Sequence, residues 1–108
     1  TFNESWVIFQ PHTYSRTKAH LDSFALSLLE FDHIIVTDIY AAREQNTYNI
    51  SSLDLVNKIN ELGKEAKYMK NFDDIAAYIR NNANQNDFVL TLGAGTVTDI
   101  GPMIVNKI

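Results

Sequence analysis

Short apolar runs rich in β-branched residues alternate along this chain with segments whose apolar residues recur at helical spacing. SWVIF (residues 5–9) is a continuous apolar run after its serine, which is typical of a strand buried on both faces. HIIVTDIY (33–40) is β-branched and predicts a second strand, and DFVLTL (87–92) predicts the clearest strand of the chain. The more polar EAKYMK (65–70) predicts a strand near a sheet edge.

Amphipathic segments follow each of these runs. One continues through Glu30, with apolar positions at Ala19, Leu21, Phe24, Ala25, Leu28 and Leu29. The next begins after Ser51, which forms a capping-box pattern with Asp54, and ends at Gly63. Its expected inward residues are Leu53, Leu55, Val56, Ile59 and Leu62. The third has Asp73 and Asp74 in its first turn, where acids suit the helix dipole, and a last helix is expected over 97–106. The inward residues of the third are Ile75, Ala76 and Ile79.

This strand–helix alternation predicts a single α/β domain over residues 1–108. The expected architecture is a Rossmann-like three-layer sandwich, with a mostly parallel sheet and helices on both faces. Ligands of such sheets bind at the carboxyl ends of the strands. Three polar loops are expected on that edge, at residues 10–17, 38–49 and 93–96.

Composition narrows the classes of partner. The formal net charge is −4 and the acids are scattered, which argues against a non-specific nucleic-acid binder. The chain has no cysteine, no long apolar run and no signal peptide, so we expect a cytoplasmic protein without a membrane span. It begins with Thr1, which leads us to expect a piece of a longer protein.

The first loop, within FQPHTYSRT (9–17), gathers many hydrogen-bonding groups between a strand and a helix. Arg16 offers a planar fork that matches a carboxylate or phosphate, and His12 and Tyr14 add further donors. We also expect free backbone N–H groups there, because the loop precedes a helix N-terminus. The alternative is that Ser15 or Thr17 caps the helix and Arg16 is an ordinary solvated residue.

The other two loops carry weaker signals. Asp38 is either a functional carboxylate or a turn former, and Arg43 beside Glu44 is by default a solvated charge pair. Gly93 and Gly95 lack the spacing of a dinucleotide fingerprint, and a close backbone approach or a tight turn explains them. The chain has no P-loop, no histidine spacing for a metal and no hydrolase motif, so the residues alone predict an anion-binding rim with no assigned catalytic group or metal ligand.

The strings FQPHTYSRTK, DIYAARE, SS-x-x-L and LGAG follow one another as they do in the C-terminal domain of the Mur ligases, which this chain resembles over essentially all 108 residues. Within that family the resemblance is best with the enzymes that join L-alanine to UDP-N-acetylmuramate in peptidoglycan synthesis. It implies a three-domain, ATP-dependent ligase that works through an acyl phosphate. The resemblance implies that ATP and magnesium are bound mainly by residues of the central domain, and that the present domain packs against that domain.

Carried onto this sequence, the resemblance implies that Arg16 binds the amino-acid carboxylate, with His12 beside it. It assigns the remaining candidates to the same rim: Tyr14, Tyr40 and Glu44 as substrate-binding residues, and Asp38, Gly93 and Gly95 as ATP-side or closure contacts. Many relatives have a second arginine where this chain has Thr13.

The family's Asp-Tyr-Gly-His-His-Pro segment is absent from this sequence, so we expect the chain alone to be inactive. Two rival interpretations remain. One is the related ligase that attaches a recycled murein tripeptide to the same sugar nucleotide. The other is a receiver-like signalling module, although Gln10, Pro11 and His12 stand where a receiver needs acids.

Overall fold

The strands form one parallel sheet in the computed structural model, which describes residues 3–93 and Val97. The strands are β1 (Ser5–Gln10), β2 (His33–Val36), β3 (Ala66–Tyr68) and β4 (Phe88–Gly93), in the order β3-β2-β1-β4. Every described pairing between neighbours is parallel, which confirms the predicted α/β class. The helices are α1 (Tyr14–Ala19), α2 (Leu21–Leu28), α3 (Ser52–Glu61) and α4 (Phe72–Asn82).

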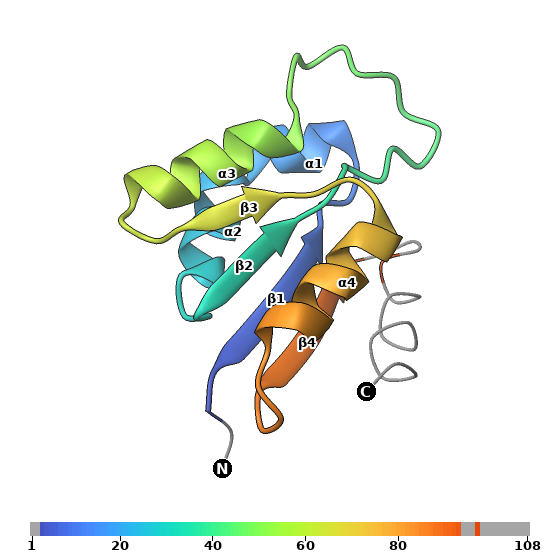
Figure 1. The fold of residues 1–108 in the computed structure, drawn as a ribbon. Helices are drawn as coiled ribbons and strands as arrows, with labels where there is room; N and C mark the ends of the chain where they lie inside the picture. The colour runs from blue at the N-terminus through green and yellow to red at the C-terminus, as the bar shows by residue number, and fades with distance from the viewer. Residues whose placement is uncertain (1–2, 94–96, 98–108) are drawn as a thin grey trace.

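Helices cover both faces of the sheet (Figure 1). Because successive strand residues point to opposite faces, Trp6 and Ile8 of β1 pack in one core and Val7 packs in the other. The first core is completed by α4, and the second by α2 and α3. The three-layer arrangement therefore follows from the continuous apolar runs in the strands.

The order of the strands places a topological switch point beside β1. The chain moves from β1 to β2 and then to β3 on one side, and α4 then carries it back across to β4 on the other side of β1 (Figure 1). Loops that leave the carboxyl ends of such strands diverge and leave room for a ligand. The expected binding rim thus lies at the carboxyl ends of β1, β2 and β4.

Helix ends were predicted well where side chains cap them. Ser51 and Asp54 form the expected capping box on α3, and Gly63 follows that helix with a φ of 95°. The inward residues expected for α4 are all buried. Its N-cap, Asn71, was not predicted; the Asn71 side chain accepts from the N–H groups of Asp73 and Asp74.

Other predicted features were wrong. The helix expected through Glu30 is broken at His20, whose φ and ψ of −118° and 22° are not helical, so α1 and α2 are separate. Leu53 and Leu62 were expected inside but are 52% and 40% exposed, because only the face of α3 with Leu55, Val56 and Ile59 meets the sheet. The regular strand β2 ends at Val36 rather than at Tyr40. The helix expected after Val97 lies outside the described residues.

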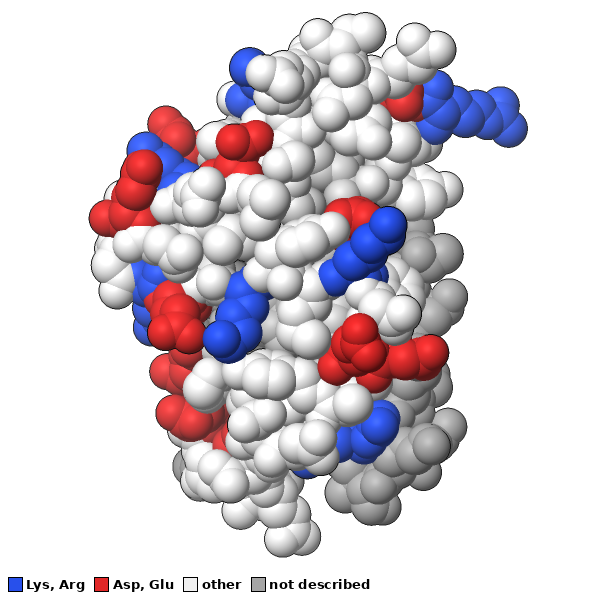
Figure 2. Space-filling model, turned by 45° about the horizontal axis from the view of Figure 1, so that its top comes forward, with Lys and Arg blue, Asp and Glu red and all other residues white. Residues whose placement is uncertain are grey.

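Charged side chains of both signs are interspersed over the face shown in Figure 2. No helix within residues 3–93 has the length and apolar character needed to cross a membrane.

Candidate functional site

The first two rim loops are joined by backbone hydrogen bonds. The Thr13 N–H donates to the Tyr40 carbonyl at 2.8 Å, and the Tyr40 N–H donates to the Pro11 carbonyl at 2.8 Å. The rings of His12 and Tyr40 are stacked, with centroids 5.8 Å apart and planes 14° apart. The chain beyond β2 therefore pairs with the segment after β1 through an isolated bridge, and this brings the predicted site residues His12 and Tyr40 together.

The Glu44 carboxylate, in the second loop, forms a further connection to the first loop through Ser15. Glu44 accepts from the Ser15 N–H at 2.9 Å and from the Ser15 hydroxyl at 2.5 Å, through different oxygens. The hydroxyl bond, followed by the backbone bond, lowers the pKa of Glu44 below its usual 4.5. Both oxygens of Glu44 are thus engaged within the protein, and a direct contact between Glu44 and a substrate stays a prediction.

The expectation of free backbone donors before α1 was wrong. Beyond the bonds already named, the Arg16 N–H donates to the Thr13 hydroxyl at 3.3 Å and the Thr17 N–H donates to the Thr13 carbonyl at 3.2 Å. Glu44 takes the Ser15 donor that an external anion would need. Anion binding at this loop therefore depends on side chains.

Thr13, rather than Ser15 or Thr17, is the N-cap of α1. Its φ of 64° lies in the left-handed region, which is strained for a β-branched residue. The Thr13 carbonyl also accepts from the Thr17 hydroxyl at 2.7 Å. The N–H, the carbonyl and the hydroxyl of Thr13 are therefore all hydrogen-bonded within the protein. Because the Arg16 N–H donates to the Thr13 hydroxyl, these bonds also fix the position of the Arg16 backbone.

Arg16 lies in the first turn of α1 and is exposed. Within residues 3–93, its guanidinium makes no ion pair or hydrogen bond with another side chain. A planar guanidinium in that state is available for a bidentate contact with a carboxylate or phosphate. The structure therefore leaves Arg16 available as a candidate anion ligand.

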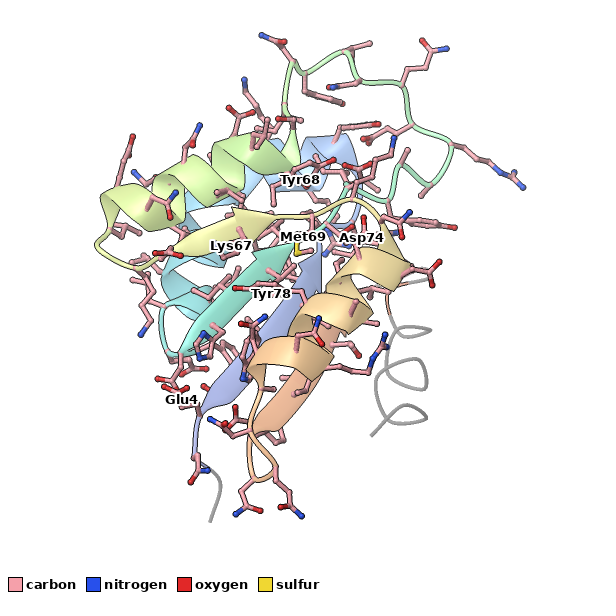
Figure 3. All side chains as sticks on the ribbon, viewed as in Figure 1. Glu4, Lys67, Tyr68, Met69, Asp74 and Tyr78 are labelled. Atoms are coloured by element: carbon pink, nitrogen blue, oxygen red, sulfur yellow. The ribbon has the colours of Figure 1, made fainter. Side chains whose placement is uncertain are left out.

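Asp38 faces a neighbour that the sequence did not predict. The hydroxyl of Tyr68, the last residue of β3, donates to an Asp38 carboxylate oxygen. This bond, helped by burial, raises the pKa of Tyr68 to about 12. Figure 3 shows Tyr68 at the carboxyl end of the sheet and Glu4 at the opposite end. The sequence pattern that could have indicated this bond is that Asp38 and Tyr68 stand at the carboxyl ends of adjacent strands, β2 and β3.

Asp38 also lines a cavity of about 260 Å³ at the rim, together with the predicted residue Tyr14. The remaining lining residues are Ile39, Asn46, Ile50, Ser51 and Ser52. The side-chain amide of Asn46 is bonded at both its atoms to the backbone of Ile50, and the Ser52 hydroxyl donates to the Thr37 carbonyl at 2.5 Å. Most of the polar lining is therefore already satisfied.

Gly93 brings the third loop against the first. It pairs with Gln10 across β4 and β1, and a Cβ at Gly93 would lie 2.4 Å from the Gln10 carbonyl oxygen. The expected close backbone approach is thus confirmed at Gly93, while Gly95 lies outside the described residues. The Gln10 side chain, itself buried, accepts from the Val97 N–H at 3.2 Å.

The part of the chain that the structure describes holds no group of three or more His, Asp or Glu side chains suited to a metal ion. Together the fold and the rim define a class: a Rossmann-like α/β domain whose candidate anion-binding side chains stand at a topological switch point. No family model matches the chain. The proteins to which the chain is similar nonetheless carry the same name.

Over 101 residues, 94% of this chain, it is 54% identical to a UDP-N-acetylmuramate–L-alanine ligase of Caldanaerobacter subterraneus. It is 43% identical over 105 residues to the ligase of the same name from Clostridium acetobutylicum. The crystal structure of UDP-N-acetylmuramate-alanine ligase from Thermotoga maritima matches 97% of this chain with a TM-score of 0.73 and 25% identity.

The chain belongs to the Mur ligase family, and its match is to the C-terminal part of the UDP-N-acetylmuramate–L-alanine ligases. It covers 22% of the length of the Caldanaerobacter protein, 23% of the Clostridium protein and 20% of the Thermotoga chain. The chain therefore spans about a fifth of the length of these relatives.

Proposed function

We propose that the chain is the amino-acid-binding domain of a three-domain, cytoplasmic ligase that joins L-alanine to UDP-N-acetylmuramate at the expense of ATP. The observation that carries this proposal is the 54% identity to a ligase of that name across nearly the whole chain. In the proposed reaction, ATP phosphorylates the carboxylate of the sugar nucleotide. The amine of L-alanine then attacks the resulting acyl phosphate.

ATP and magnesium are assigned to another part of the intact protein. The sequence has no P-loop, and the described residues offer no metal cluster. Magnesium, when bound, would neutralise phosphate charge during phosphoryl transfer. The present domain contributes binding and orientation, so the chain alone is proposed to be inactive.

Arg16 is proposed to hold the carboxylate of L-alanine. Its guanidinium is exposed and free of side-chain partners within residues 3–93, and its backbone is fixed by the Thr13 cap. His12 lies on the same loop, held against Tyr40, and would be the second polar contact. Packing of this domain against the central domain would exclude water and align the amine with the acyl phosphate.

The test uses the full-length protein, with ADP release measured in the presence of UDP-N-acetylmuramate and ATP. Turnover with L-alanine is the expected result. Turnover only with the murein tripeptide would assign the protein to murein recycling instead, and no turnover with either amine would reject the proposed function.

The Arg16→Ala variant tests the carboxylate contact. We expect it to weaken the use of L-alanine by about 2–5 kcal/mol, the usual effect of breaking a desolvated charge pair. Lys18→Gln is a matched control, because it removes a positive charge from the same short helix. An unchanged apparent affinity for L-alanine in Arg16→Ala would contradict the assignment, as would an equal loss in Lys18→Gln.

A further inference from the structure

The turn at Ala42 and Arg43 has an unusual backbone. Their φ angles are 52° and 72°, so two consecutive residues other than glycine lie in the left-handed region. The Glu44 N–H closes the turn by donating to the Ala41 carbonyl at 2.9 Å. Two successive positive φ angles in a closed four-residue turn are normally supplied by asparagine and glycine. An alanine and an arginine are strained there.

The strain is maintained by contacts on both sides of the turn. Before it, Tyr40 is bonded through its backbone to Pro11 and Thr13. After it, Glu44 is held by both the N–H and the hydroxyl of Ser15. The partners in these contacts all lie within residues 11–15, directly before Arg16, so the turn is fixed relative to the candidate carboxylate site. Residues held in strained conformations by their surroundings are concentrated at functional sites.

The strained turn holds Arg43 outward. Arg43 is exposed, and among the described residues its guanidinium has no hydrogen bond or ion pair. The adjacent carboxylate does not neutralise it, because both Glu44 oxygens are directed to Ser15. The loop between β2 and α3 also extends well beyond the sheet (Figure 1). Arg43 is therefore a second available cation on the same rim as Arg16.

Each of the two molecules that react in the proposed amide-forming step carries an anionic group close to the reacting atoms, and the inference that follows rests on that proposed function. The amino-acid carboxylate is assigned to Arg16, which leaves the phosphate of the acyl phosphate. We infer that Arg43 binds that phosphoryl group as the amine attacks. In this step the amine nitrogen forms a bond to the acyl carbon, and the bond from that carbon to the phosphate oxygen breaks. Inorganic phosphate leaves with the bonding electron pair, and the amine loses its proton to solvent.

A guanidinium aimed at the phosphate would act mainly as that oxygen gains charge. Such contacts stabilise the transition state more than the bound substrates, so they change kcat more than KM. The expected behaviour of Arg43 therefore differs from that of Arg16, whose carboxylate contact is made in the bound amino acid as well. This difference can be measured in the full-length protein.

Arg43→Gln removes the charge and leaves a side chain of similar length on the same backbone. We expect its kcat to fall by about tenfold or more, while KM for L-alanine stays within about twofold of the wild type. Ala42→Gly is the matched control, because it relieves strain in the same turn and keeps the guanidinium. We expect Ala42→Gly to raise the melting temperature and to leave kcat unchanged.

The inference is overturned if kcat of Arg43→Gln stays within about twofold of wild type, or if the loss appears only in KM for L-alanine. It is also overturned if Ala42→Gly loses as much kcat, because the geometry of the loop would then matter rather than the charge. Wild-type protein without L-alanine-dependent ADP release would reject the proposed function itself. Turnover by the wild type with an unaffected Arg43→Gln variant rejects only the role of Arg43.

Discussion

Replacing Gly93 by alanine tests how closely β1 and β4 approach at the rim. The new Cβ would lie 2.4 Å from the Gln10 carbonyl oxygen and 3.2 Å from the Gln10 Cβ. The φ of Gly93 is 136°, which a side chain rarely adopts. The Gln10 backbone cannot yield freely, because Gln10 is buried and its side chain accepts from the Val97 N–H.

The two effects can be estimated separately. A residue other than glycine in a sparsely populated backbone region costs about 1–3 kcal/mol. Forcing extra atoms into a packed site costs typically about 1–3 kcal/mol. We therefore expect Gly93→Ala to lower the free energy of unfolding by about 2–6 kcal/mol, the sum of the two ranges.

Gly63→Ala is the matched control for the backbone term. Gly63 also has a positive φ, 95°, but a Cβ there would meet no atom within 4 Å. It should show the backbone cost alone, so the difference between the two variants, about 1–3 kcal/mol, isolates the contact with Gln10. Urea unfolding followed by the fluorescence of Trp6, the single tryptophan and buried, measures both. Equal destabilisation of the two variants would refute the close approach as the cause.

Three further predictions concern the rim and its supports. The Glu44–Ser15 contact stabilises the fold fully at pH values above the usual Glu44 pKa of 4.5, and this stabilisation is lost as the pH falls through the lower pKa of the folded protein. The stability of Glu44→Gln in acid unfolding should therefore lack this part of the pH dependence, and identical profiles for the variant and the wild type would contradict the prediction. Tyr68 should ionise near pH 12, and the ultraviolet difference between wild type and Tyr68→Phe should show this; a transition near pH 10 would argue against the bond to Asp38. Ser51→Ala should cost about 1 kcal/mol in urea unfolding through loss of the α3 cap, and no change would mean that Asp54 alone suffices.

The fold was largely predictable because its signals are local. A buried parallel strand needs a continuous apolar run, and β1, which is almost wholly buried, coincides closely with such a run. The capping box at Ser51 is likewise a property of neighbouring residues. Where the sequence misled, the deciding contact was distant: Leu53 follows the helical pattern, yet it is exposed because the sheet lies along another face of α3.

The gathering of the candidate residues at one edge of the sheet was predictable, but the contacts among them were not. The parallel arrangement was enough to place His12, Arg16 and Tyr40 on one edge. The pairing of Ser15 with Glu44, however, joins residues 29 positions apart and depends on how far the second loop folds back over β1. Tyr68 was missed for a similar reason, because its bond to Asp38 spans 30 positions and two strands.

These internal contacts change what the rim can recognise. If the backbone donors before α1 were free, any small anion could bind there with little discrimination. Because Glu44 and Thr13 take those donors, the guanidinium groups of Arg16 and Arg43 remain as the candidates for anion recognition. The two loops are already tied together in this domain alone, so closure on a neighbouring domain would require little further ordering of the rim. An amino acid held by such a rim would be presented in one orientation, as the proposed attack of its amine on an acyl phosphate requires.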